Sequence, residues 1–107
     1  MGVMVIACYR PKPDGEGELL DLMKTHLPIL RAEGLVGDEP SLCGRAKDGT
    51  IVEVFTWKSQ EAIEQAHENP AVIAMWERYA KVCDFMPVGE LDEANQLFSP
   101  LAPIDLN

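Results

Sequence analysis

The chain begins with an unbroken run of apolar and aromatic residues from Val3 to Tyr9. A strand with one face in water alternates apolar and polar residues, so an unbroken run predicts a strand that is covered on both faces. Pro11, Pro13 and Gly15 follow closely. Proline and glycine at these positions predict that the strand ends in a loop.

The next segment, residues 16–33, has the periodicity of a helix with one apolar side. That side is made of Leu19, Leu20, Met23, Leu27 and Leu30. Pro28 lacks a backbone N–H group, so we expect a kink or a break in this helix near His26 and Leu27. Gly34 and Gly37 end the segment.

Two strand-like stretches, Pro40–Lys47 and Thr50–Trp57, flank the pair Asp48-Gly49. An Asp-Gly pair supplies the positive φ angles of a type I′ turn, so the two stretches predict an antiparallel hairpin. Side chains alternate between the two faces of a strand. One face of the second stretch therefore carries Ile51, Glu53, Phe55 and Trp57.

Two helix starts follow the hairpin. Ser59 predicts the N-cap of a helix that runs to about His67. Asn69 and Pro70 predict the N-cap and the first residue of another helix. The apolar stripe of this last helix consists of Val72, Trp76, Tyr79 and Cys83.

The remaining elements are short. Residues 85–88 predict a fourth strand, residues 90–97 a short helix and residues 99–107 an extended or frayed tail. The order strand, helix, hairpin, helix, strand predicts an α+β fold of the ferredoxin-like type, with a four-stranded antiparallel sheet and both helices on one face. We expect this domain to occupy residues 1–90, with a C-terminal short helix and extended tail in residues 91–107.

The first strand bears on the assembly of the protein. Helices can cover only one face of such a sheet, whereas the run from Val3 to Tyr9 predicts cover on both faces. We therefore expect a second copy to pack on the open sheet face. Two sheets face to face would make a homodimer of the dimeric α/β-barrel type.

Composition and charge narrow the partners. The chain has 107 residues, of which 47% are apolar and 25% charged, as in an ordinary globular protein. A net charge of −9 repels phosphate backbones and anionic membranes, so we expect neither nucleic acid nor a membrane as partner. No signal peptide or spanning stretch is recognisable, and we expect a cytoplasmic protein. The cysteines Cys8, Cys43 and Cys83 form no C-x-x-C pair, and reduced thiols fit that location.

Glu53 is the most informative polar residue, because it lies in the middle of a strand on the apolar face of the hairpin. If that face lines a cavity between two sheets, a partly desolvated carboxylate there is a candidate general base or an anchor for a substrate hydroxyl. The alternative is an ion pair between Glu53 and Arg45 across the hairpin.

The chain has two histidines, His26 and His67. His67 is a candidate proton shuttle. The alternative is a helix C-terminal histidine bonded to the last carbonyl groups. For His26, beside the apolar stripe of the first helix, we expect a structural role. Because no Cys, Asp or Glu accompanies either histidine at ligand spacing, we expect no metal site.

Aromatic residues could form the wall of a binding site for a flat apolar ligand. The candidates are Phe55, Trp57, Trp76 and Tyr79, with Cys8 as a further wall residue. The alternative is that these side chains are simple core residues. Apolar neighbours raise the pKa of a thiol, so Cys8 is expected to be unreactive.

One pattern runs through the second half of the chain. It consists of Glu53-Val-Phe-Thr-Trp57-Lys-Ser, followed by Ala62, His67, Asn69-Pro70 and Trp76. This pattern resembles the antibiotic biosynthesis monooxygenase-like domains of the dimeric α/β-barrel superfamily, over about residues 3–88. Members of that superfamily include cofactor-free oxygenases of aromatic polyketides, haem-degrading enzymes and small proteins of unassigned role. The resemblance therefore implies a fold rather than one function.

Carried over to single residues, the resemblance places Trp57 where members have a cavity-facing tryptophan. Haem-degrading members have an asparagine where this chain has Cys8, and a haem-ligating histidine where it has Trp76. The resemblance thus implies no haem ligation by that route. Aromatic oxygenases combine their tryptophan with Asn, Tyr and Arg, and Arg78 and Tyr79 are candidates for the last two.

Two hypotheses follow. The first is a cofactor-independent monooxygenase that acts on an aromatic or polyketide-like small molecule, with Glu53 or His67 as the base and the aromatic residues as the wall. The second is a non-catalytic dimer that binds a ligand or a partner protein. We expect no cofactor in either case.

Overall fold

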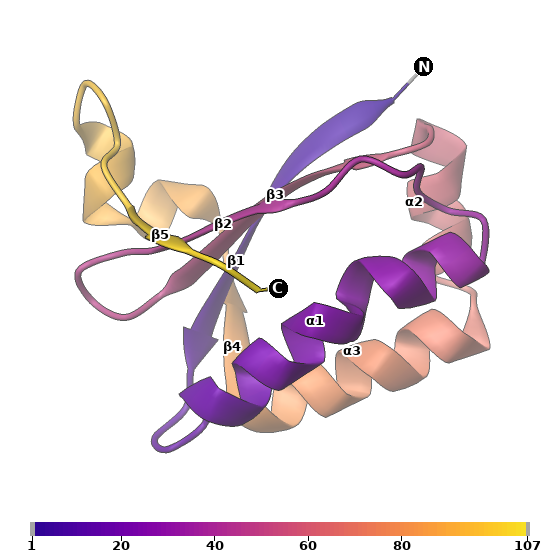
Figure 1. Ribbon diagram of the computed structural model, residues 1–107, viewed down its shortest axis with the longest axis horizontal. Coiled ribbons are helices and arrows are strands. Elements are labelled where there is room, and N and C mark those ends of the chain that lie inside the picture. The colour runs from indigo at the N-terminus through magenta and orange to yellow at the C-terminus, as the bar shows by residue number, and fades with distance from the viewer. Residues whose placement is uncertain (1, 107) are drawn as a thin grey trace.

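Strand β1 (Val3–Pro11) organises the sheet of this protein, whose computed structural model describes residues 2–106 (Figure 1). On one side it pairs with β3 (Ile51–Trp57), and on the other its C-terminal end pairs with β4 (Cys83–Met86). Strand β2 (Leu42–Arg45) joins β3 to β5 (Ala102–Ile104). The order is β4-β1-β3-β2-β5, and every pair is antiparallel.

Three helices cover one face of this sheet (Figure 1). They are α1 (Glu16–Ala32), α2 (Gln60–Ala66) and α3 (Pro70–Val82). The expected caps are confirmed, because the Ser59 side chain accepts a hydrogen bond from the Ala62 N–H and the Asn69 side chain accepts from Ala71 and Val72. The α+β ferredoxin-like prediction is therefore confirmed, with one strand more than expected.

Helix α1 runs through Pro28 without a break, contrary to one of the two outcomes expected there. A proline inside a helix removes one hydrogen bond. Leu27 and Leu30, one on each side of Pro28 along the chain, are buried in the main core. Their packing against the sheet and α3 holds the helix together across the missing bond.

The hairpin between β2 and β3 is confirmed, but its type I′ turn is not. Only Gly49 has a positive φ (93°), whereas a type I′ turn needs two such residues. The Gly49 N–H donates to the Ala46 carbonyl (3.0 Å), and the Thr50 N–H donates to the Asp48 carboxylate (2.8 Å). This side-chain bond favours the ordinary φ of Asp48, so glycine alone takes the left-handed conformation.

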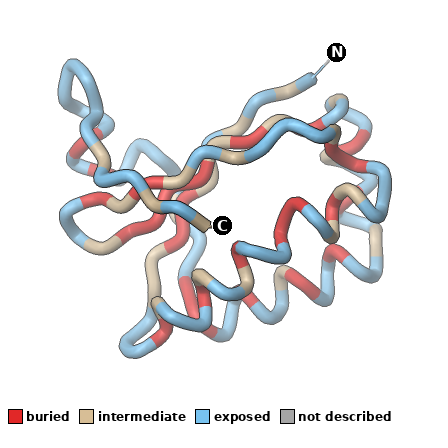
Figure 2. Tube along the Cα trace, viewed as in Figure 1, coloured by how far each residue is buried: buried red, intermediate tan, exposed pale blue. Residues whose placement is uncertain are grey.

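The main core lies between the sheet and the helices, and a smaller core lies on the other face. Buried residues are concentrated on β3 and recur along α1 and α3, whereas β1 buries only Cys8 and Tyr9 (Figure 2). The smaller core consists of Cys8, Ala46, Val52 and Leu91. Cover on the second face of β1 is therefore only partial, because Cys8 is buried there while Met4 and Ile6 are exposed.

The chain after β4, which we call the C-terminal segment (residues 88–106), differs from the expectation in three ways. The fourth strand ends at Met86, and the expected helix is replaced by two 3₁₀ turns, η1 (Val88–Glu90) and η2 (Asp92–Asn95). The expected tail instead contributes β5, which pairs with β2. Leu91 belongs to the smaller core and Leu101 packs against it, and this burial anchors the segment.

Gly44 permits the close approach of this segment. A Cβ atom at position 44 would lie 2.9 Å from the Leu101 Cβ and 3.3 Å from the Ala102 oxygen. We expect Gly44→Ala to lower the free energy of unfolding by about 1–3 kcal/mol through this overpacking. Gly17→Ala is the control, because a Cβ there meets nothing within 4 Å. Denaturant titration measures both, and equal midpoints for Gly44→Ala and wild type would contradict close docking of the segment.

Among residues 2–106, no helix has the length and apolar character needed to cross a lipid bilayer.

Candidate active site

Glu53 lies at the centre of the main core. It is 0% exposed, and its side chain faces the helices rather than the open sheet face. Its Oε1 atom accepts a hydrogen bond from the Tyr9 hydroxyl on β1 at 2.9 Å. The Nδ1 atom of His26 on α1 lies 2.9 Å from the same oxygen. The cavity between two sheets, where Glu53 was expected, is therefore replaced by the space between one sheet and its helices.

The contact between Glu53 and His26 fixes the orientation of the imidazole. A carboxylate can only accept hydrogen bonds, so an ionised Glu53 holds the proton on Nδ1 and leaves Nε2 as the acceptor. Within the described residues, Nε2 has no hydrogen-bond partner. The pair has the arrangement in which a carboxylate orients a histidine base and stabilises its charged form.

Two tyrosines border this pair and stay protonated. Burial, followed by the charge of Glu53, raises the pKa of Tyr9 well above its usual value. Burial and then Glu53 also raise the pKa of Tyr79. A phenol that keeps its proton at neutral pH can donate a hydrogen bond but cannot act as a base. In residues 2–106, the Tyr79 hydroxyl and the Oε2 atom of Glu53 are buried without a hydrogen-bond partner.

His26 and Tyr9 open onto a cavity of about 380 Å³, which we call the aromatic pocket. Its rings come from Tyr9, His26, Phe55, Trp57, His67, Trp76 and Phe85. Val5, Ile6 and Ala7 of β1 complete the lining. The pocket lies beside these residues because β4 pairs only with residues 8–11 of β1. Among the described strands, none pairs with the rest of that edge.

The structure brings together four of the seven residues singled out in the sequence, with a fifth directly behind them. Phe55, Trp57, Trp76 and His67 line the aromatic pocket, and Glu53 lies behind His26. Tyr79 does not line it, but its ring packs against the rings of Tyr9 and His26 at 5.2 and 5.8 Å between centroids. Cys8 lies on the other face of the sheet, in the smaller core.

His67 lies at the rim of the pocket. It is exposed, and its Nδ1 is 2.8 Å from the Ile63 carbonyl in the last turn of α2. Its ring lies 5.1 Å from that of Trp76. The local hydrogen bond predicted for a helix C-terminal histidine is thus present, on a residue that also faces the pocket.

The expected ion pair between Glu53 and Arg45 is wrong, because the Arg45 Nε donates to Glu16 at 2.9 Å. From the sequence, His26 was expected to have only a structural role, and Tyr9 was not predicted to be a site residue. A signal for His26 was present, since it is three residues after Met23 and four before Leu30 on the buried stripe of α1. A histidine on a buried helix face needs a polar partner. Glu53 was the buried strand residue able to supply one.

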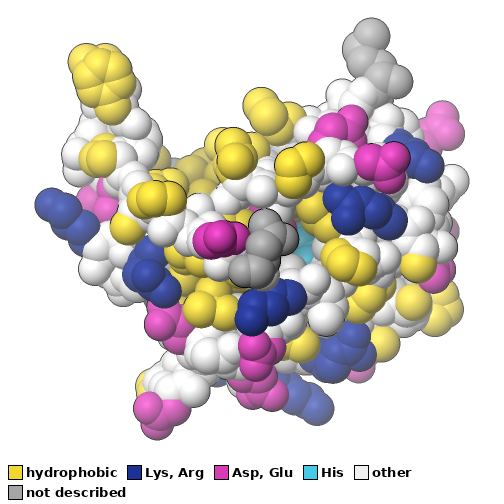
Figure 3. Space-filling view, viewed as in Figure 1, with side chains coloured by type: hydrophobic (Ala, Val, Ile, Leu, Met, Phe, Trp, Pro, Cys, Tyr) yellow, Lys and Arg dark blue, Asp and Glu magenta, His cyan; other side chains and the backbone are white. Residues whose placement is uncertain are grey.

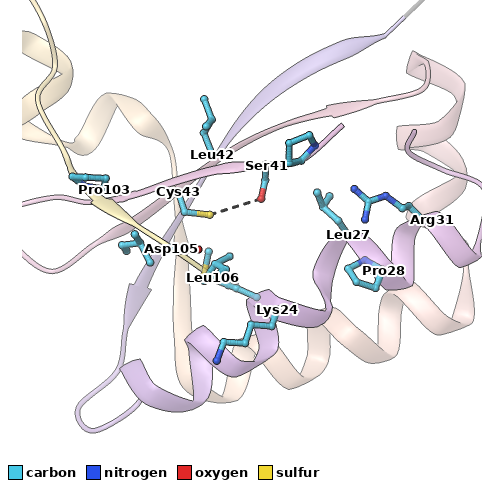
Figure 4. Close-up of a pocket in the computed structure, with 13 residues that line it drawn as sticks. Lys24, Leu27, Pro28, Arg31, Ser41, Leu42, Cys43, Pro103, Asp105 and Leu106 are labelled. Atoms are coloured by element: carbon cyan, nitrogen blue, oxygen red, sulfur yellow. Dashed lines mark hydrogen bonds between the residues drawn. The ribbon is translucent and has the colours of Figure 1, made fainter. Parts of the chain in front are cut away.

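A second cavity, of about 430 Å³, lies between α1, β2 and the C-terminal segment (Figure 4). The Sγ of Cys43 lies in its wall, 3.8 Å from the Ser41 hydroxyl. Its two cations already have partners. Arg31 donates to the carbonyl groups of residues 37–39, and Lys24 lies 3.6 Å from Asp21. The aromatic pocket, with its oriented histidine, is therefore the stronger candidate for chemistry.

The thiols are expected to be unreactive in the folded protein. Burial raises the pKa of Cys43 and of Cys83 to about 11 and also raises that of Cys8. A raised pKa keeps a thiol protonated, and only the thiolate is alkylated. At pH 8 we expect iodoacetamide to label Cys43 and Cys83 about 100-fold more slowly in the native protein than in the unfolded one. Mass spectrometry over time measures this, and rapid labelling of either thiol in the native protein would contradict it.

No group of three or more His, Cys, Asp or Glu side chains within residues 2–106 is arranged to hold a metal ion.

Comparison with known proteins agrees with this fold. The family model of the antibiotic biosynthesis monooxygenases matches residues 2–78, which include Glu53, both histidines and both tryptophans. The structure of Rv0793 from Mycobacterium tuberculosis is similar to this chain, with 22% identity and a TM-score of 0.61. The match covers 88% of this chain and 99% of that one, and it shows a shared fold. No curated protein matches the chain.

Proposed function

Because the chain belongs to the antibiotic biosynthesis monooxygenase family, we propose that it is a small homodimeric enzyme that oxygenates a flat, hydroxylated aromatic molecule without a cofactor. One observation carries this proposal. His26 is held by the buried Glu53 at the wall of a pocket that also contains both tryptophans of the chain. The pocket thus combines a candidate base with flat apolar walls.

The proposed reaction begins with the loss of a substrate proton to the Nε2 atom of His26. Glu53 stabilises the imidazolium that forms, in the role of a positioning residue. The deprotonated ring then gives electrons to dioxygen. In a balanced oxygenation of a ring CH₂ group, one oxygen atom becomes a carbonyl and the other leaves as water, so the substrate supplies every electron. The protein needs to supply only the base and a pocket that excludes water.

The other candidates have supporting roles in this proposal. Trp57 and Trp76 hold the faces of the substrate, and Phe55 extends the wall. His67, which is exposed at the rim, is the alternative base. Tyr79 supports the rings of Tyr9 and His26 from behind. Cys8 has no part, because it lies on the other face of the sheet.

The open sheet face supports the homodimer. Met4 is 72% exposed, Ile6 51% and Leu42 74%, although all three are large apolar residues. Exposed apolar patches on small proteins mark interaction surfaces. A second copy of the chain would cover this face and complete the barrel that the family fold implies.

The tryptophans provide a direct test of ligand binding. Trp57 and Trp76 are the only tryptophans of the chain, and both line the aromatic pocket, so all indole fluorescence comes from it. We expect a three-ring hydroxylated ketone such as dihydroxyanthrone to quench this fluorescence. Trp57→Ala should weaken its binding about tenfold, since a well-packed aromatic contact contributes roughly 1–2 kcal/mol. Fluorescence titration measures both constants.

Ile73→Ala is the matched control, because Ile73 is an apolar surface residue of α3 that does not line the pocket. An unchanged signal over a panel of flat aromatic compounds would contradict the proposed site. Oxygen consumption distinguishes a cofactor-independent enzyme from a non-catalytic dimer. Binding with oxygen uptake supports the enzyme, whereas binding without uptake supports a non-catalytic ligand-binding dimer.

A further inference from the structure

The second face of the sheet is covered over only part of its area. The C-terminal segment packs on the half that contains Cys8 and Val52. The other half, which we call the bare patch, consists of Met4, Ile6, Leu42 and Val54. These residues are neighbours across the strands, because Val54 pairs with both Ile6 and Leu42. The patch contains no charged side chain, although the chain has a net charge of −9. A second copy can therefore approach it without placing like charges in contact.

The C-terminal segment carries apolar residues that its own subunit does not cover. Leu97 is 91% exposed and Phe98 88%, and we call this pair the tip. The segment projects from the sheet on the side away from the helices (Figure 1), and hydrophobic side chains are gathered at its end and along the adjoining edge (Figure 3). Ser99, with a φ of 45°, turns the chain directly after the tip. The tip thus stands beside the open face, at the opposite end from Met4.

The bare patch alone is too small for a stable interface. It spans three strands, β1, β3 and β2, over about three residues each, or ~14 Å by ~10 Å. That is roughly 140 Å² in projection, against about 800 Å² that each partner buries in a standard interface. A second copy that touched only the patch would leave the exposed tip unused. The tip supplies additional apolar surface from the same chain.

We infer that two copies meet about a two-fold axis so that the tip of each covers the Met4 and Ile6 end of its partner's sheet. This inference rests on the homodimer of the proposed function. In a two-fold contact, if one residue touches another, the reverse contact also forms. The tip stands at one end of the face and the bare patch at the other. An axis between them therefore brings each tip onto the partner's patch.

The contact would also complete the aromatic pocket. Ile6 belongs to the bare patch and lines the pocket, so a partner side chain on Ile6 lies at the pocket rim. Each active site would then be bordered by Leu97 and Phe98 of the other copy. These residues lie beyond residue 78, where the family match ends. The rim would accordingly be a feature of this chain's own C-terminal segment.

Disulfide trapping tests the inference. In the double variant Met4→Cys with Phe98→Cys, we expect oxidation to give a species of twice 11.8 kDa on a non-reducing gel. The control is Ile73→Cys with Phe98→Cys, because Ile73 lies on α3, away from the open face. Each single variant controls for the native thiols. The contact is supported if the Met4→Cys with Phe98→Cys variant gives the doubled mass and none of the control variants does.

Light scattering on the wild-type protein tests the homodimer separately from the tip contact. A mass of 11.8 kDa at micromolar concentration would overturn both the proposed dimer and the tip contact. A wild-type dimer without the disulfide, or with a bond inside one chain, would overturn the tip contact alone. As a second variant, Phe98→Asp is expected to weaken dimerisation at least tenfold. An unchanged dimer in Phe98→Asp would likewise overturn the contact.

Discussion

Replacing Glu53 by alanine is expected to lower the free energy of unfolding by about 3–5 kcal/mol. Glu53 is fully buried and accepts from the Tyr9 hydroxyl and from Nδ1 of His26, both at 2.9 Å. The change leaves two buried donors without an acceptor, and each lost bond to a charged group costs about 1.5–3 kcal/mol. It also leaves a cavity among well-packed rings, which adds to the loss.

Glu53→Gln keeps the volume and one acceptor oxygen, so its destabilisation should be clearly smaller than that of Glu53→Ala. Glu61→Ala is the matched control, because Glu61 is exposed in the first turn of α2. Urea unfolding followed by tryptophan fluorescence measures all three variants. A midpoint for Glu53→Ala close to that of Glu61→Ala would show that the buried cluster contributes little to stability.

Replacing His26 by glutamine is expected to lower the rate of the proposed oxygenation by about 10²- to 10⁴-fold, the usual contribution of a general base. Glutamine can still donate to Glu53, so the fold should survive. Its side chain cannot take up a proton, however. Binding of the flat ligand should change little, because Trp57 and Trp76 remain in place. The loss should therefore appear in kcat rather than in KM.

His67→Gln is the corresponding control, since His67 lines the same pocket and its Nδ1 lies 2.8 Å from the Ile63 carbonyl rather than from a carboxylate. Oxygen uptake at saturating substrate measures both variants. If His67→Gln abolished the reaction and His26→Gln preserved it, the base would be His67. The buried pair of Glu53 and His26 would then be a purely structural feature.

Local signals in the sequence were sufficient for most of the elements. Ser59 and Asn69 cap their helices as expected, because a capping side chain acts on backbone groups two or three residues away. The pairing of the hairpin strands likewise follows from a short turn. The C-terminal segment was harder to predict. Strand β5 depends on contacts with residues far away along the chain, namely the close approach to Gly44 and the packing on the smaller core.

The site was only partly predictable for a related reason. Alternation along β3 places Glu53, Phe55 and Trp57 on one face, and helical spacing adds Trp76. The partner of Glu53 is 27 residues away on another element, however. Arg45 was expected as the partner because the Asp48-Gly49 turn could place it across the hairpin from Glu53. The choice between Arg45 and His26 depends on how α1 crosses the sheet, and a single sequence does not specify that crossing.

The short length of β4 has a consequence for the behaviour of the protein at high concentration. It leaves residues 3–7 of β1 with one bare edge among the described residues, in a stretch of β-prone side chains without charge or proline. Such a stretch is a template for strand addition and hence for aggregation. Lysine or proline would ordinarily guard an edge of this kind. Here those residues would intrude on the pocket wall and the open face. In the proposed dimer, the ligand and the partner copy would shield this strand instead.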